Sequence, residues 1–553
     1  MRGESPSRAP GSRAARSLAV FGLFLVLAIL STWPWAARLK NAVPDVVDTY
    51  EAAWRLSWGF HQTFHDPLHL FDGNVFYPHR DTLAFSETLY GISVPLFPLF
   101  AAGVTPLAAY GVAILLGFAL SGLAAYRLAR TLGAPAAAAR VAGIAFAFAP
   151  YRLGQLNHVG SVWAFGLPLA LEALVLFVRA RTAKRAAWLA GTLVLLGLTW
   201  VTWLLLAAVP LAATAILLAA RERALSDPRL WLGGAAAVLV AAATLSPFLL
   251  AYERVARAEA FVRTADEAAF FSGRPSNWLD VAANNRFWTA LKPARMSGER
   301  RLCPGVFLLL AAVAGAVAGA SPGASPPTRA LALIGAVWAL AGFLGSLGLN
   351  TPFHRFLWEF VPGFRGMRVP MRWTMVGLTG LSLLAAAAVA RAGRASRAAG
   401  IVLCALLLVE QRAWPLDLET GAPDPSPLAR RLAATPMRGG VAELPARQPF
   451  LALYVLRAAD HLRPLIDGSS SYEPESSRLV GTLSAERPVS PALMDHLEAV
   501  GASYVVLHED LCEDEERVAL RDFLGAQEAA GRLRHVGRVA PADEMWAVVK
   551  TER

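Results

Sequence analysis

Apolar runs long enough to cross a membrane recur along this chain from residue 17 to residue 412. Inside a bilayer the backbone has no water to bond, so such a run must form a helix. The chain is 55% hydrophobic and only 17% charged, below the quarter that is typical of soluble domains. We therefore predict a mainly α polytopic helical membrane bundle with about eleven spans. The expected spans are residues 17–36, 107–126, 136–150, 160–180, 186–200, 202–220, 231–251, 304–320, 329–347, 373–391 and 398–412.

A further apolar run, residues 92–104, is short and contains Pro95 and Pro98, which favours an interfacial or re-entrant helix over a crossing. The Arg-rich connections test this choice. With the basic tail 1–16 in the cytoplasm, they all fall on the cytoplasmic side, as the positive-inside rule requires. Counting 92–104 as a crossing would reverse every connection after it. These connections are residues 127–140, 179–185, 221–229 and 391–397.

Under this topology the membrane domain spans 17–412, and three longer loops face outside, namely 37–106, 252–303 and 348–372. The segment 413–553 differs from the rest, because it contains strand-like runs separated by helix-like stretches. We predict that it forms a small extracytoplasmic α/β domain. Within it, the run 463–474 either binds acceptor glycan or forms a turn-rich edge. The strand-like runs are Gly440–Leu444, Ser503–His508 and a terminal run from Trp546.

The net charge of +11 comes mostly from arginines in the short connections, where it fixes topology, so we expect no nucleic-acid partner. The three cysteines show neither metal-site nor disulfide-scaffold spacing. The sequence also lacks a Walker loop, a dinucleotide fingerprint, a zinc motif and a nucleophile elbow. Chemistry based on a soluble cofactor is therefore not expected.

The first external loop has the acidic residues Asp45 and Asp48 soon after the first span. Their spacing puts both carboxylates on one face if a helix starts there, close to its N-terminus. Two roles stay open for Asp48, a helix cap or first-turn acid and a catalytic general base. The same loop continues to His79 and Glu87, which we expect to contact substrate.

Three histidines in this loop, His61, His65 and His69, recur every four residues. Such spacing could place three imidazoles on one helix face for a divalent metal. The stronger interpretation is an interfacial helix with His and Trp facing lipid headgroups, which Pro67 breaks before His69. We assign no metal ligand in this chain.

Two further external segments are candidates for substrate contact. The turn 150–158 brings Tyr151, Gln155 and His158 together, as a pocket rim or as a solvated loop. The second segment, 360–373, has three arginines outside the membrane, against the positive-inside trend. Arginine binds phosphate in a bidentate way, so we expect a lipid phosphate or pyrophosphate there, with headgroup contact as the alternative. These arginines are Arg365, Arg368 and Arg372.

The order of these motifs resembles the GT-C superfamily of membrane glycosyltransferases, in particular bacterial glycosyltransferase-39-like or dolichyl-phosphate-mannose-protein-mannosyltransferase-like members. The resemblance covers roughly the whole membrane part and rests on no single motif. The matching segments are Asp48 with Trp54 and Trp58, Asp66 to His79, Leu128 to Gly133, Tyr151 to His158, Ser297 to Gly305, and Pro362 to Arg372.

The resemblance implies transfer of a sugar from a polyprenyl-phosphate donor to an external glycan, lipid or protein, by an enzyme embedded among the lipids of a bacterial inner membrane. It makes Asp48 the base, places Arg368 and Arg372 on the donor phosphate, and leaves Mg²⁺ or Mn²⁺ open as a cofactor. The commoner family pattern has adjacent Asp and Glu, whereas here Thr49 follows Asp48. In this chain Asp45 or Glu51 would have to supply the second acid instead of the residue next to Asp48. The residues expected to bind substrate are Asp45, His79, Glu87, Tyr151, Gln155, His158, Arg365, Arg368 and Arg372.

The main alternative is a non-catalytic protein of the same architecture that binds or translocates a lipid-linked saccharide. A secondary transporter is disfavoured, because no charged pair lies in the middle of a span and no inverted repeat is evident.

Overall fold

The computed structural model describes residues 10–260, 263–291, 298–422 and 425–549. Residues 1–9 of the basic tail and Ser297 of the segment 297–305 lie outside this description. The chain forms two compact units, which we describe separately. Unit 1 comprises residues 1–37, 112–246 and 262–417, and unit 2 comprises residues 38–111, 247–261 and 418–553.

The regular elements in the described residues of unit 1 are all helices. Proline and glycine residues divide the chain into these helices, and several begin with Pro in the first turn, where its missing N–H has no intrahelical partner to lose. Two long helices, α4 (Pro106–Thr131) and α11 (Pro228–Ala258), continue into unit 2. The other helices are α1 (Pro10–Ser31), α5 (Ala136–Ala147), α6 (Pro150–Leu153), α7 (Val159–Val162), α8 (Gly166–Ala180), α9 (Ala183–Thr199), α10 (Val201–Arg221), α12 (Ala265–Phe270), α13 (Val306–Ala320), α14 (Pro326–Ser346), α15 (Pro352–Phe360), α16 (Trp373–Arg391) and α17 (Ser396–Glu410).

Seven stretches of the described chain are helical, long and apolar enough to cross a membrane, so the chain is a multi-pass membrane protein. They are Ala14–Ser31, Pro106–Thr131, Val159–Ala180, Val201–Arg221, Pro228–Ala258, Pro326–Ser346 and Pro370–Arg391. The other four predicted spans fall on the shorter helices α5, α9, α13 and α17. The number of eleven spans therefore stays a prediction.

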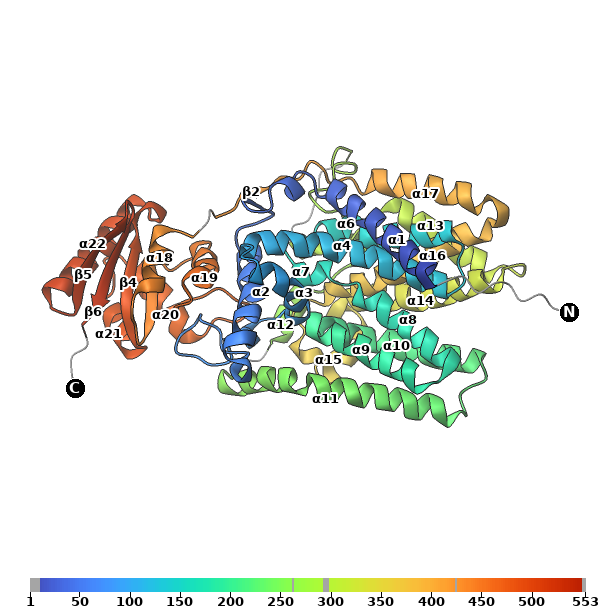
Figure 1. Ribbon diagram of the computed structural model, residues 1–553, viewed down its shortest axis with the longest axis horizontal. Coiled ribbons are helices and arrows are strands. Elements are labelled where there is room, and N and C mark those ends of the chain that lie inside the picture. The colour runs from blue at the N-terminus through green and yellow to red at the C-terminus, as the bar shows by residue number, and fades with distance from the viewer. Residues whose placement is uncertain (1–9, 261–262, 292–297, 423–424, 550–553) are drawn as a thin grey trace. The chain divides into compact units, whose positions relative to one another are not determined.

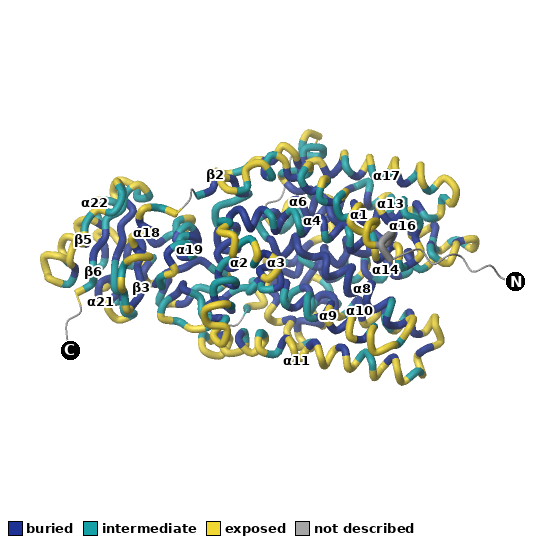
Figure 2. The backbone as a smooth tube through the Cα atoms, in the orientation of Figure 1, coloured by how far each residue is buried: buried dark blue, intermediate teal, exposed yellow. Residues whose placement is uncertain are grey.

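Helix α16 is the centre of unit 1 and packs against α14, α13 and α5. Small residues allow its close approach to α14. A Cβ at Gly342 would lie 2.1 Å from the backbone nitrogen of Gly377, and one at Gly380 would lie 2.2 Å from that of Ala339. This is how membrane helices pack when the hydrophobic effect does not drive them together. Figure 2 shows α16 as a buried helix.

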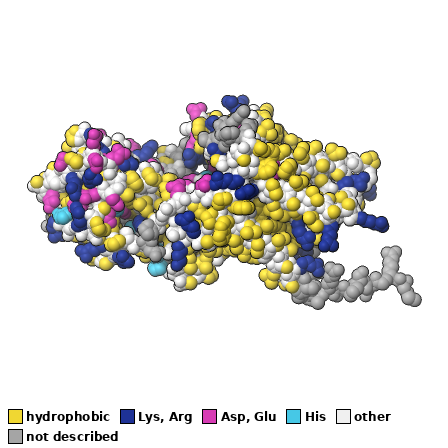
Figure 3. Space-filling model, turned by 90° about the horizontal axis from the view of Figure 1, so that it is seen from above, with side chains coloured by type: hydrophobic (Ala, Val, Ile, Leu, Met, Phe, Trp, Pro, Cys, Tyr) yellow, Lys and Arg dark blue, Asp and Glu magenta, His cyan; other side chains and the backbone are white. Residues whose placement is uncertain are grey.

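Helix α11 contrasts with α16, because only 22% of its most apolar window is buried, against 89% for Pro370–Arg391. Its exposed side chains in unit 1 include Trp231, Leu232 and Leu239. Contiguous exposed apolar surface of this kind suits contact with lipid. Figure 3 shows hydrophobic side chains covering much of the visible surface of the helical unit.

Unit 2 contains a mixed sheet of four strands in the order β3-β4-β6-β5 (Figure 1). Strands β3 and β4 are parallel, with Val441 opposite Tyr504, and the other pairs are antiparallel. The predicted strands at 440–444 and 503–508, and the one from Trp546, correspond to β3, β4 and β6. The bounds are β3 (Gly440–Leu444), β4 (Ala502–His508), β5 (Leu533–Ala540) and β6 (Asp543–Val548), with a separate pair β1 (Ala42–Val43) and β2 (Glu419–Thr420).

The helices of unit 2 come from both the first external loop and the C-terminal segment. The run predicted to be interfacial or re-entrant forms α3, with both of its prolines inside the helix. The helices are α2 (Asp48–His65), α3 (Tyr90–Ala101), α18 (Pro427–Ala434), α19 (Phe450–His461), α20 (Glu475–Ala485), α21 (Ala492–Ala499) and α22 (Asp514–Ala529).

Backbone hydrogen bonds join the first external loop to the C-terminal segment. The Tyr77 amide donates to the Leu465 carbonyl at 2.8 Å, and the Leu465 amide donates to the Asn74 carbonyl at 2.9 Å. The next residue, Ile466, donates to the Val441 carbonyl of β3 at 2.9 Å. Loop residues and the segment after α19 thus continue the ladder beyond β3. Of the segment predicted to form a separate domain from 413, residues 418–553 belong to a unit that also contains residues 38–111.

Candidate functional site

The start of α2 shows the surroundings of Asp45 and Asp48, and both roles of Asp48 remain predictions. The helix begins at Asp48, and the side chain of Asp45 accepts hydrogen bonds from the amides of Val47 (2.7 Å) and Asp48 (2.8 Å). Asp45 therefore satisfies the free N–H groups that precede the helix. The capping bonds belong to Asp45, and Asp48 is a half-buried acid in the first turn.

Glu51 lies one turn after Asp48 and is only 8% exposed. One of its oxygens accepts a bond from Arg55 at 2.9 Å, and the other is hydrogen-bonded by the Ser469 hydroxyl. Burial raises the pKa of the Glu51 carboxyl, Arg55 and Ser469 oppose that rise, and the charge of Asp48 adds to it. The two acids on this helix face therefore sit in different environments, as in sites that need an acid and a base.

The serine-rich segment, which we define as Gly468–Tyr472, covers this turn of α2. Besides the Ser469 bond, the Ser470 hydroxyl accepts from Arg55 at 3.3 Å, and Ser471 bonds to Ser86 at 3.0 Å. Part of the run 463–474 thus contacts the buried acid of the first loop. Sequence reasoning did not anticipate this contact, because its partners are more than 380 residues apart.

His79 joins three distant parts of unit 2. Its Nδ1 lies 2.8 Å from Glu259 Oε1, and its Nε2 lies 2.8 Å from the Ser476 hydroxyl. The hydroxyl of Tyr472 donates to the other oxygen of Glu259 at 3.0 Å. His79, expected to contact substrate, therefore also ties the loop to α20 and to the residue that follows α11.

Glu87 lies in the turn before α3 and is half-buried. The next residue, Thr88, donates its amide to the Tyr252 hydroxyl of α11 at 3.1 Å. Glu87 is thus placed near the end of α11.

The three histidines of α2 and the following turn do not share one helix face, because α2 ends at His65, before Pro67. His61 stacks on His65, and His69 pairs with Asp66 at 2.8 Å. Within the described residues, no group of three or more His, Cys, Asp or Glu side chains is arranged to hold a metal ion. The donor set seen here does not fit a divalent metal, and we derive no step through one.

In unit 1 the turn 150–158 has a buried arginine at its base. Arg152 is fully buried and donates to Ser121 Oγ at 2.9 Å and to the Val162 carbonyl at 2.7 Å. Its guanidinium also lies over the Phe146 ring, 4.8 Å from the ring centre. Burial lowers the pKa of Arg152 to about 9. This arginine anchors the turn to the helical core.

Glu299 brings together the residues predicted from two separate segments. It accepts from Arg372 at 3.2 Å and from the Gln155 amide at 3.5 Å, and its charge also acts on Tyr151. Burial raises the pKa of Glu299, but Arg372 and His158 outweigh it and lower the value overall. One cluster around Glu299 therefore contains Arg372 together with Tyr151, Gln155 and His158. The sequence of either segment alone did not predict that the two segments meet.

The three arginines of the segment 360–373 differ from one another. Arg372 pairs with Glu299 and lies 4.5 Å from the Trp200 ring centre. Arg368 pairs with Glu267 at 2.9 Å and is 43% exposed, and Arg365 is exposed. The anionic partners expected for these arginines are thus supplied in part by carboxylates of the chain itself.

No protein-family model and no curated protein matches the sequence. The structure is similar to the cryo-EM structure of the arabinofuranosyltransferase AftD from mycobacteria, with a TM-score of 0.63 and 18% identity. That alignment covers 100% of this chain and 40% of the other chain. A mutant form of the same enzyme gives a TM-score of 0.62 at 18% identity, covering 100% and 42% of the two chains.

The chain therefore shares its fold with this arabinofuranosyltransferase, which agrees with the glycosyltransferase-like fold that the sequence resemblance implied. The chain spans about two fifths of the length of AftD. At 18% identity the likeness concerns the fold.

Proposed function

We propose that this protein transfers a sugar from a polyprenyl-phosphate donor to an acceptor outside the bacterial inner membrane. The observation that carries the proposal is the first turn of α2, where half-buried Asp48 precedes a buried, hydrogen-bonded Glu51. The fold likeness supports it, since the fold is that of membrane glycosyltransferases.

In the proposed reaction the Asp48 carboxylate takes the proton from an acceptor hydroxyl as its oxygen attacks the anomeric carbon of the sugar. The bond from that carbon to the phosphate oxygen breaks, and the polyprenyl phosphate leaves with the electron pair. Glu51 and Asp45 act by positioning. Glu51 is held by Arg55 and Ser469, and Asp45 fixes the start of the helix.

For unit 1 we propose separately that exposed Arg365 and half-exposed Arg368 bind an anionic phosphate group. Arg368 has five N–H donors, and its ion pair with Glu267 in the described part of the chain involves only the Nε donor. We also propose that Tyr151, Gln155 and His158 contact a sugar through the cluster around Glu299. His79 and Glu87 are proposed substrate contacts of unit 2.

The test is transfer of radiolabelled sugar from a panel of polyprenyl-phosphate sugars by the purified full chain in nanodiscs. We expect one donor class to support transfer to a glycan, lipid or protein acceptor. The variant Arg365→Gln should raise the apparent KM for that donor, whereas Arg329→Gln, another exposed arginine, should leave it unchanged.

A second function, a protein that binds or translocates a lipid-linked saccharide without transfer, is favoured by one observation. Arg372, which the resemblance places on the leaving donor phosphate, already pairs with Glu299, whereas exposed Arg365 is left to bind a phosphate without transfer. Saturable binding of a polyprenyl-phosphate sugar, with no transfer from any donor in the panel, would support this function and contradict the first.

A further inference from the structure

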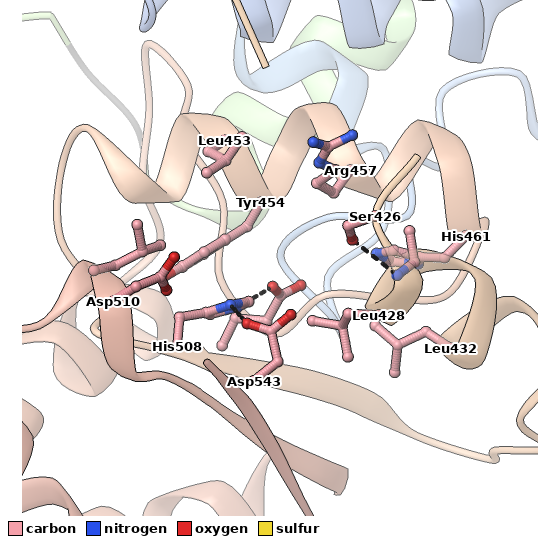
Figure 4. Close-up of a pocket in the computed structure, with 13 residues that line it drawn as sticks. Ser426, Leu428, Leu432, Leu453, Tyr454, Arg457, His461, His508, Asp510 and Asp543 are labelled. Atoms are coloured by element: carbon pink, nitrogen blue, oxygen red, sulfur yellow. Dashed lines mark hydrogen bonds and ion pairs between the residues drawn. The ribbon is translucent and has the colours of Figure 1, made fainter. Parts of the chain in front are cut away.

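A polar pocket lies within the C-terminal part of unit 2, between α18, α19 and the sheet (Figure 4). Its volume is about 130 Å³. Cavities of about 150 Å³ accept one six-membered ring such as benzene. The pocket is slightly smaller than this, and exposed Asp510 in its lining shows that it opens to solvent on one side. Its polar lining includes Glu443, Tyr454, Arg457, His461, His508 and Asp543.

His508 holds one end of the pocket. Its two ring nitrogens lie 2.8 Å from Glu443 Oε2 and 2.9 Å from Asp543 Oδ1, and its ring stacks on Tyr454 with centres 4.9 Å apart. Burial alone would lower the pKa of His508, but the two carboxylates outweigh it and raise the value to about 9. The imidazolium of His508 therefore donates to both acids at neutral pH. Its bond to Glu443 uses Oε2 and leaves Oε1 without a bond from His508.

Two polar atoms of the pocket residues are buried without a hydrogen-bond partner within the described chain, namely Glu443 Oε1 and His461 Nε2. Glu443 is 3% exposed and His461 is 2% exposed. The Arg463 amide donates to His461 Nδ1 at 2.9 Å, and burial lowers the pKa of His461 to about 4. In neutral imidazole the proton then sits on Nε2, so His461 offers a donor and Glu443 offers an acceptor.

Leaving two buried polar groups without hydrogen-bond partners is unfavourable, so a partner for each of them is favoured. A hydroxyl can donate to a carboxylate and accept from an imidazole N–H. An ammonium can only donate and a carboxylate anion can only accept. Figure 4 shows His508 and Asp543 at one end of the pocket and His461 at the other, with Leu432 and Leu453 among the apolar lining.

We propose that this pocket binds one sugar ring through its hydroxyl groups. The ring hydroxyls satisfy Glu443 and His461, and the apolar side chains contact the C–H faces of the ring. Asp510 is exposed and lines the pocket, so the site opens to solvent where the rest of a glycan can continue. This binding site does not depend on glycosyl transfer.

The test is saturation-transfer NMR and calorimetry on the full chain in nanodiscs, with a panel of methyl glycosides of hexoses and pentoses as probes and methylammonium as the charge control. We expect saturable binding of at least one glycoside with a Kd in the millimolar range, which is common for weak single-ring ligands. Glu443→Gln should weaken it at least tenfold.

A second variant, Leu453→Trp, fills the pocket and keeps its polar groups, so it should abolish binding. Leu479→Trp, on the exposed face of α20, is the matched control and should bind as the native chain does. The proposal is overturned if no glycoside binds, which would mean that the pocket holds water only. It is also overturned if binding survives both pocket variants, or if methylammonium binds and glycosides do not.

Discussion

At the scale of single residues, some of the candidate site could be predicted and some could not. Asp48, Glu51 and Arg55 follow helical spacing, so their shared face can be read from the sequence once a helix is expected there. Glu259 and Glu299 could not be found in this way. Each acts on a residue more than 70 positions away, and nothing in its local sequence indicates a partner.

Asp467 gives a prediction for the pH dependence of stability. It is buried, accepts from Ser477 at 3.3 Å, and burial raises its pKa to about 8, from about 4 in an unfolded chain. The folded state then binds an extra proton between these values. The contribution of Asp467 to stability is therefore full below about pH 4 and is lost as pH rises through about 8.

Asp467→Asn keeps the acceptor and cannot ionise. Its melting temperature should exceed that of the native chain by about 2 °C or more at pH 8, and the gap should shrink towards pH 5. Differential scanning fluorimetry in detergent at both pH values measures this. A gap that is the same at both pH values would show that Asp467 does not take up a proton on folding.

At the scale of elements, the sequence predicted most of the secondary structure. All eleven expected spans lie on helices, and β3, β4 and β6 match the expected strands. Strand β5 was missed because it is an edge strand with outward Arg534 and Arg538, interrupted by Gly537 at a φ of 129°. Edge strands commonly carry charge and bulges, which hide the alternating apolar pattern.

The serine-rich segment gives a prediction at this scale. A Cβ at Gly468 would lie 2.7 Å from the Phe76 ring, closer than atoms tolerate, so Gly468→Ala should push the segment away from Glu51. We expect a loss of stability of about 1–3 kcal/mol, as for other overpacked sites.

Gly525→Ala is the control, because a Cβ there meets nothing within 4 Å and the residue lies in α22. It should be neutral or slightly stabilising. The measurement is the thermal unfolding of the full chain with Gly468→Ala and with Gly525→Ala, each compared with the native chain. Equal stability of both would show that the segment accommodates the methyl group without moving.

At the scale of the whole molecule, the sequence did not predict which segments of the chain combine to form unit 2. The unit draws on three parts of the chain, and its core cluster includes Trp54 and Phe76 of the first loop with Val441 and Tyr454 of the C-terminal segment. Sequence patterns report which face of an element is apolar. They do not report which distant element covers that face.

The isolated segment 418–553 should therefore not fold as the predicted independent domain. Without residues 38–111 it loses part of its core and exposes apolar surface, so we expect aggregation or a non-cooperative melt. Expression of 418–553 alone, with circular dichroism and thermal melting, tests this. A sharp transition at the temperature of the full chain would contradict it.

The most direct test of the account compares single-turnover sugar transfer by the native chain, Asp48→Asn and Asp66→Asn in nanodiscs. Asp66 is an exposed acid just after the end of the same helix, so it controls for loss of charge. If Asp48 is the general base, Asp48→Asn should lower the rate about 10²-fold or more with binding of the donor retained, and Asp66→Asn should match the native rate. Native transfer by Asp48→Asn would contradict the account.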